Sequence, residues 1–169
     1  MKNTILALAS LSLFSSSALA AKMYFPDKDE PQFTITIPND WKPETVDGVL
    51  EAISPDDNVY LAAWELATKK DLESLGKDIE DMLKDHAKKI KIVGEPEKAK
   101  VGGTMEGLLF NGTAKDKEDG KDISFYALVF SPDKEHAAVI FIEAGADTTQ
   151  AQASKLTNIL KSIKPGKGE

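Results

Sequence analysis

Two stretches of sequence, residues 105–114 (MEGLLFNGTA) and 123–130 (ISFYALVF), decide the fold of this chain. Both are rich in apolar, β-branched and aromatic residues, which favour β-strands. The segment between them, residues 115–122, is polar and contains Asp119-Gly120, a frequent turn sequence of β-hairpins. We therefore expect two antiparallel strands joined by this loop, from which the rest of the sheet can be built outward.

Further strand patterns lie on both sides of this hairpin. Residues 33–38 (FTITIP) alternate apolar and polar side chains, as a half-buried strand does. Residues 59–66 are apolar on both faces for most of their length, which predicts a central strand. Three other stretches fit shorter, weaker or more continuously apolar strands: 48–53, 97–101 and 137–144.

Two amphipathic helices are expected to pack on this sheet. The first begins near residue 68 and ends near Lys91, because Leu72, Leu75, Ile79, Met82, Leu83 and Ile90 recur at helical spacing. The second is expected to begin at Asp147, with Gln150 as its capping-box partner. Its predicted buried stripe consists of Leu156, Ile159, Leu160 and Ile163.

These elements predict one α+β domain with a mainly antiparallel sheet of six or seven strands and two main helices. The chain shows no internal repeat and no linker long enough to divide it. We expect four segments: a signal peptide (1–20), a flexible N-terminal arm (21–32), the domain itself (33–164) and a mobile tail (165–169).

The first twenty residues have the features of a secretory signal peptide. Lys2 supplies the positive start, residues 5–14 form an apolar run, and Ala18-Leu19-Ala20 is the pattern after which signal peptidase cleaves. The run is shorter than the roughly 20 apolar residues that span a bilayer. We therefore expect cleavage and export to the bacterial periplasm, with no membrane span. Lipid attachment is excluded, because the chain has no cysteine.

Composition excludes several classes of function. The formal net charge is −7 and all basic residues are lysines, whereas nucleic-acid-binding proteins usually carry a basic excess that includes arginine. The absence of cysteine removes disulfides, thiol nucleophiles and thiolate metal sites. We expect no nucleic-acid partner and no cofactor.

The pattern Phe33-x-Ile35-x-Ile37-Pro38-x-x-Trp41 resembles the opening strand of the PsbP-like group of proteins. The order of predicted elements over residues 33–164 is similar as well. The group contains the photosystem II subunit PsbP, a Ran-binding nuclear import factor and periplasmic proteins of the DcrB type. The resemblance implies an α/β/α sandwich and an accessory or adaptor role. The lipidated cysteine of DcrB-type proteins is missing here, so membrane attachment is not implied.

A search for catalytic or metal-binding motifs finds none. His86 and His136 have no partner at the spacing of a zinc motif, and no serine lies in a nucleophile elbow. Residues 116–122 are acidic, but their glycine lies fifth and not sixth from Asp116, unlike a calcium loop. A hairpin turn is the favoured interpretation, with a weak cation site as the alternative. Glu65 and Glu143, at the ends of apolar strands, are the acid pair that a hydrolase would need.

Aromatic residues on or near the strands are the candidates for ligand binding. Most are expected to form the core, but Trp41, Tyr60 and Trp64 could line a groove between the sheet and the first helix. Such a groove would suit a small apolar ligand. The favoured hypothesis is a non-enzymatic periplasmic accessory protein that acts on a protein partner in the cell envelope. A small-ligand binding module is the alternative, and a hydrolase is the least favoured.

Overall fold

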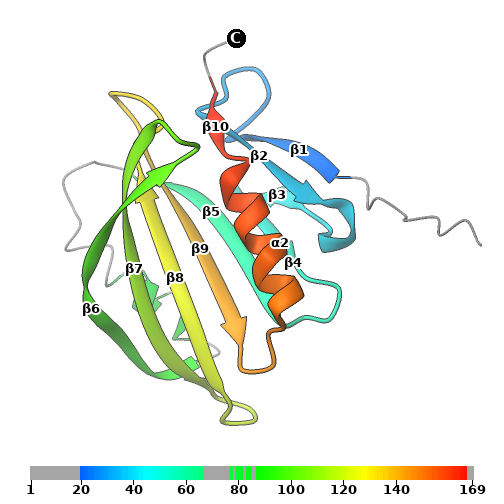
Figure 1. Ribbon diagram of the computed structural model, residues 1–169, viewed down its shortest axis with the longest axis vertical. Helices are drawn as coiled ribbons and strands as arrows, with labels where there is room; N and C mark the ends of the chain where they lie inside the picture. The colour runs from blue at the N-terminus through cyan, green and yellow to red at the C-terminus, as the bar shows by residue number, and fades with distance from the viewer. Residues whose placement is uncertain (1–19, 67–76, 78, 82, 85–86, 167–169) are drawn as a thin grey trace, which may run out of the picture.

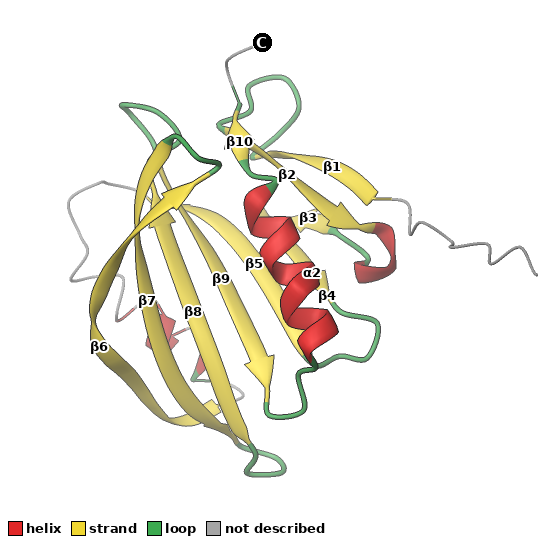
Figure 2. Ribbon diagram, viewed as in Figure 1, coloured by secondary structure: helices red, strands yellow, loops and turns green. Residues whose placement is uncertain are grey.

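The computed structural model describes residues 20–66, 77, 79–81, 83–84 and 87–166. Within this part the chain forms an α+β fold, with a seven-stranded sheet, a three-stranded sheet and helix α2, Gln150–Lys161 (Figure 2). The predicted fold class is therefore confirmed. None of the helices in the described residues is long and apolar enough to cross a membrane.

Every neighbouring pair in the seven-stranded sheet is antiparallel. The strands follow in spatial order as β3 (Glu44–Val46), β4 (Val49–Ile53), β5 (Val59–Leu66), β9 (Ala137–Gly145), β8 (Asp122–Phe130), β7 (Met105–Asp116) and β6 (Ala87–Val101). The hairpin of β7 and β8 stays in register from Gly107 opposite Phe130 to Lys115 opposite Asp122. β5 pairs with both β4 and β9, as expected for a central strand.

Strand alternation divides the buried side chains between the two faces of the sheet. On one face, helix α2 and β2 pack against β5, β8 and β9, and Leu61, Ile140 and Phe130 belong to this core. On the other face, Phe125 and Phe141 form a second core with Ile79 and Leu83. The parity of a strand residue therefore fixes which core it joins.

A separate three-stranded sheet holds both ends of the described chain together. β2 (Phe33–Pro38) lies between β1 (Ala20–Phe25) and β10 (Lys164–Pro165). Ala20 was expected to end the signal peptide and residues 21–32 to form a flexible arm, but residues 20–25 all pair with β2. The start of the expected tail pairs with β2 too, and Gly166 N–H donates to the carbonyl of Gln32 at 2.7 Å. Backbone pairing thus extends beyond the predicted domain at both ends.

The predicted end of the first helix is wrong. Residues 77, 79–81 and 83 are helical, but Ala87–Val101 form strand β6, which pairs with β7 from Ala87 opposite Asp116. Ile90 reaches the second core from this strand. Its spacing from Leu83 fits a helix, yet residues 89–92 (KIKI) also alternate polar and β-branched side chains, as a strand does. The rest of this helix, including His86, lies outside the described residues.

Helix α2 begins two residues later than predicted. Thr149 is its N-cap, and its hydroxyl accepts from the N–H of Gln152, whose side chain in turn accepts from the N–H of Thr149. Asp147 is instead part of the turn before the helix, where Thr148 N–H donates to the carbonyl of Gly145 at 3.1 Å. The capping-box spacing fits both pairs in the sequence, and the turn after β9 selects the second.

Gln152 also connects α2 to the turn between β4 and β5. Its Nε2 donates to both carboxylate oxygens of Asp56, at 2.7 and 2.6 Å. Asp56 accepts from the Ser54 hydroxyl at 2.7 Å, and hydrogen bonds led by this one lower the pKa of Asp56. Gln152 is only 8% exposed, so water cannot readily replace these partners.

We expect Gln152→Met to lower the free energy of unfolding by about 1–2 kcal/mol, because it removes the capping box and the bonds to Asp56 at nearly constant volume. Urea denaturation measures this change. Gln150→Met, on the exposed side of the same helical turn, is the matched control and should change stability little. Equal losses in the two variants would contradict the assignment of the cap.

Candidate functional site

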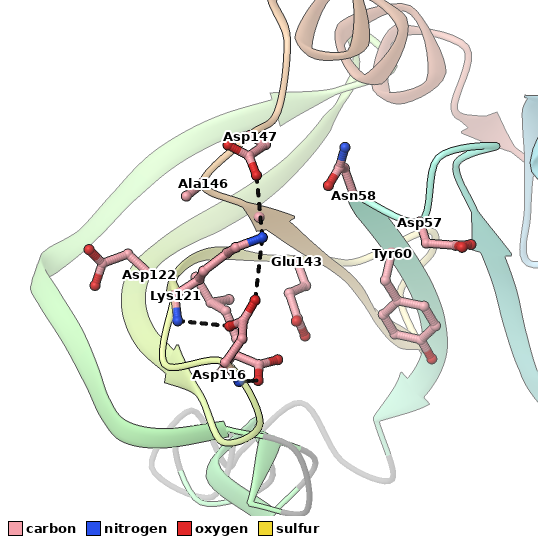
Figure 3. Close-up of a pocket in the computed structure, with 12 residues that line it drawn as sticks. Asp57, Asn58, Tyr60, Asp116, Lys121, Asp122, Glu143, Ala146 and Asp147 are labelled. Carbon is pink, nitrogen blue, oxygen red and sulfur yellow. Dashed lines mark hydrogen bonds and ion pairs between the residues drawn. The ribbon is translucent and has the colours of Figure 1, made fainter.

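An acidic pocket of about 200 Å³ lies at one end of the large sheet (Figure 3). The turn before β5, the hairpin between β7 and β8, and the segment after β9 supply its walls. Six carboxylates line it: Asp57, Asp116, Asp119, Asp122, Glu143 and Asp147. The residues come from three turns and from the adjoining ends of β5, β7, β8 and β9, so only the folded sheet brings them together.

Lys121 is the basic residue among the lining residues of this acidic pocket. Its amine lies 3.3 Å from Asp119 and 3.5 Å from Asp147, and Figure 3 shows it reaching toward Asp147. These two carboxylates raise the pKa of Lys121, with Asp119 contributing most. One lysine among six acids leaves the pocket negative, so it favours cationic groups over apolar molecules or anions.

Several carboxylates of the acidic pocket take part in hydrogen bonds or ion pairs of the protein. No group of three or more histidine, cysteine, aspartate or glutamate side chains in the described residues could hold a metal ion. One of these carboxylates stabilises the hairpin itself, because Asp116 Oδ1 accepts hydrogen bonds from the N–H groups of Glu118 and Asp119. The favoured interpretation of residues 116–122 as a hairpin turn is thus supported by these hydrogen bonds.

Tyr60 forms part of the pocket wall and also bonds outside it. Its hydroxyl donates to Glu51 Oε1 at 2.7 Å. Burial, this hydrogen bond and the nearby charges of Glu51 and Glu143 raise the pKa of Tyr60. The phenol therefore stays protonated at physiological pH and acts as a hydrogen-bond donor.

The three predicted ligand-binding residues do not share one site. Tyr60 and Trp64 lie four residues apart on β5, half-buried on the face of the second core. The Trp64 ring lies 6.4 Å from that of Phe141. Trp41 is fully buried in the first core, on the other side of the sheet. A groove that contained all three would have to pass through the sheet.

Trp41 does line a second, smaller pocket of about 160 Å³. Its lining is mixed: four carboxylates and Lys42 lie among apolar residues, and the carboxylates are Asp40, Glu44, Glu51 and Asp57. The Trp41 indole Nε1 is buried and has no hydrogen-bond partner among the described residues. Composition alone gave no signal for the carboxylates that meet in either pocket, because 28 acidic residues allow too many groupings.

The acid pair considered for a hydrolase is widely separated. Glu143 pairs with Tyr60, and Glu65 lies five residues further along β5, a distance of about 16 Å in an extended strand. The parity of the two strands also directs the two side chains to opposite faces. Carboxylates that flank a glycosidic bond lie within about 10 Å of each other, so this pair cannot serve that chemistry.

His136 and Asp133 form a local ion pair in the turn between β8 and β9. The His136 Nδ1 lies 2.7 Å from Asp133 Oδ2, and Asp133 Oδ1 also accepts from two backbone N–H groups. Burial opposes ionisation of Asp133, but the bonds from His136 and the backbone outweigh it and lower its pKa to about 2. The bond to Asp133 raises the pKa of His136. The pair stabilises this turn.

This pair predicts a defined pH dependence. Because the folded pKa of His136 is raised, its contribution to stability is full below about pH 6.5 and is lost as the pH rises through the folded value. An NMR titration of the His136 ring should therefore give a pKa above that of a model peptide. Asp133→Asn should bring the pKa back down. An unchanged titration in that variant would contradict the pairing.

No known protein-family profile matches the chain, and no curated protein sequence matches it. Solved structures do share its fold. LpqN of Mycobacterium tuberculosis, described as involved in cell envelope biogenesis, aligns with a TM-score of 0.53 and 16% identity over 86% of this chain and 90% of LpqN. The Ran-binding protein Mog1p of Saccharomyces cerevisiae aligns with a TM-score of 0.52 and 13% identity over 89% of this chain and 97% of Mog1p.

A protein from Bacteroides thetaiotaomicron aligns with a TM-score of 0.50 and 16% identity over 79% of this chain. This chain spans only 45% of that protein's length. At these identities the comparisons establish a common fold and nothing about activity. The PsbP-like and DcrB-like assignment remains a resemblance at the level of sequence, whereas the fold shared with an envelope-biogenesis protein and a Ran-binding protein is established.

Proposed function

We propose that this chain is a non-enzymatic, exported accessory protein of the cell envelope that acts through its surface on a protein partner. The observation that carries the proposal is the similarity of its fold to that of LpqN over nearly the full length of both chains. The signal-like sequence of residues 1–20 supports export of the chain. The separation of Glu65 and Glu143 counts against the acid pair that was named as one a hydrolase would need.

Export is tested by fractionating bacteria that express the full chain and determining the N-terminus of the periplasmic form by mass spectrometry. We expect it to begin at Ala21. A variant with Ala18→Leu and Ala20→Leu is the control, because large residues at these positions block signal peptidase. Retention of the unprocessed wild-type chain in the cytoplasm would contradict the proposal.

The partner is tested by chemical crosslinking in intact cells at native expression levels. We expect a discrete crosslinked species that contains one further envelope protein. The same chain without residues 2–20, retained in the cytoplasm, should not form this species. A wild-type chain that remains uncrosslinked in the envelope would count against an adaptor role.

A small-ligand binding module is the second candidate, favoured by the half-buried Trp64 beside Phe141 on the second core. Native mass spectrometry of the gently purified protein tests it. A bound species that is lost in Trp64→Ala and kept in Tyr126→Ala, on the other face, would support this function. A bare monomer in all three proteins would eliminate it.

A further inference from the structure

Helix α2 covers only part of its face of the large sheet. The helix lies in front of β5 in Figure 1 and leaves the front of β6, β7 and β8 open. Alternate residues of β8 contribute Leu128 and Phe130 to the core on this side, so Tyr126 and Ser124 point to the same side. Both are exposed, and Tyr126 is 41% exposed. In the described part of the chain, no helix or strand covers this part of the sheet beside α2.

Strand register fixes which side chains share this surface. Val93 lies opposite Asn111, which lies opposite Tyr126. One row further along the strands, Lys91 lies opposite Thr113. We define the open face by these residues and one lysine of the following row: Val93, Asn111, Tyr126, Lys91, Thr113 and Lys88.

The open face carries apolar contact area at one end. Val93 is 48% exposed and Tyr126 is 41% exposed, with Asn111 between them. Adjacent strands lie about 4.8 Å apart, so these two side chains are separated by about 10 Å and can contact the same bound residue. Tyrosine is among the residues enriched at protein–protein interfaces.

The other end of the open face is positive on a chain whose net charge is −7. Lys88 and Lys91 are exposed, and neither forms an ion pair with a carboxylate in the described part of the chain. The Lys88 amine donates to the carbonyl of Lys117 at 3.5 Å, which leaves its charge uncompensated.

Lys115 and Asp122 lie in the same row as Lys88 and pair with each other at 2.6 Å, so together they add no net charge. Glu97, opposite Leu109, points to the same side one row beyond Val93 and makes that end of the face negative. Helix α2 borders this surface and contains no acidic residue. The end of the face at Lys88 and Lys91 thus complements negative groups, whereas the end at Val93 does not.

We infer that the open face is a docking surface for an extended, acidic protein segment. Same-side residues of an extended chain repeat every 6.6–6.8 Å. The side chains that pair with alternate residues of β7 have the same spacing, and these are Val93 (opposite Asn111), Lys91 (opposite Thr113) and Lys88 (opposite Lys115). An apolar residue of the segment would contact Val93 and Tyr126. Carboxylates at the next two same-side positions would meet Lys91 and Lys88. This inference rests on the proposed function, since it identifies the surface by which the protein contacts its partner.

The probe is a synthetic peptide in which leucine is followed by alternating serine and glutamate, titrated into the ¹⁵N-labelled protein. We expect saturable shifts of the backbone amides of Asn111, Thr113, Ser124 and Tyr126. Lys88→Gln with Lys91→Gln should weaken binding about tenfold, as the loss of two charge contacts implies. The matched control is Lys98→Gln with Lys100→Gln, because these exposed lysines lie on the same strand and point to the opposite face. That control should bind normally.

Three results would overturn the inference: no saturable shifts on the open face, equal weakening in both double variants, or equally tight binding of short-chain polyphosphate at the same amides. The last would identify a general anion-binding surface. Failure of the proposed function is distinguishable. If an envelope partner crosslinks equally well to the Lys88→Gln/Lys91→Gln variant, the accessory role stands and the open face is not the docking surface. If no partner is found at all, both proposals fail.

Discussion

Gly112→Ala is expected to lower the free energy of unfolding by about 3 kcal/mol or more. Gly112 lies on β7 directly beneath the ring of Phe125, and a Cβ at this position would be 1.9 Å from the Phe125 Cζ. Phe125 is fully buried and stacks on Phe141 at 6.0 Å, so the ring cannot move aside without opening the second core. Thermal unfolding should show a decrease of about 6–12 °C in Tm.

The steric origin of this loss can be isolated with a double-mutant cycle. Phe125→Leu removes the ring that opposes the new methyl group, so Gly112→Ala should cost much less in that background. Thr113→Ala, on the next and exposed position of β7, is the control for a change in strand propensity. Strictly additive losses for Gly112→Ala and Phe125→Leu would contradict the proposed contact.

The sheet was largely predictable because its central strands carry strong local signals. Residues 105–114 and 123–130 differ from the observed β7 and β8 mainly at the ends. The apolar character of residues 59–66 indicated a strand with partners on both sides, and β5 has them. These signals depend on burial of whole strands, which the sequence expresses directly.

Elements at the edges were less predictable, because their pairing depends on distant parts of the chain. Val46 of β3 is 47% exposed and the strand has only three residues, so no apolar pattern marks it. Residues 20–25 become a strand because β2 offers a free edge. At residues 87–91 the sequence fits a helix and a strand, and pairing with β7 decides between them.

The candidate site could be predicted only in part. The spacing of Tyr60 and Trp64 along one strand implies a common face, and the structure places them so. The position of Trp41 depends on how residues 39–41 fold against the first core, which no local pattern specifies. The acidic pocket depends on three turns meeting at one end of the sheet, which only the strand order determines.

Trp41→Ala separates a structural role from a ligand-binding role for this residue. Trp41 is fully buried among the residues of the first core, so its removal should lower the free energy of unfolding by about 3–5 kcal/mol. Trp64→Ala should cost less, because Trp64 is only half-buried. Chemical denaturation of both variants measures the difference.

Trp41→Phe provides the matched test of the same residue. This change keeps most of the ring and deletes an indole N–H that is buried without a hydrogen-bond partner in the described residues. We expect a loss of only about 1–2 kcal/mol, because the missing volume is partly offset by the removal of an unsatisfied donor. If Trp41→Phe were as damaging as Trp41→Ala, the N–H would have a partner that contributes to stability, such as a buried water. If neither variant lost stability, Trp41 would be free to serve the pocket that it lines, and its burial would reflect a role in ligand binding.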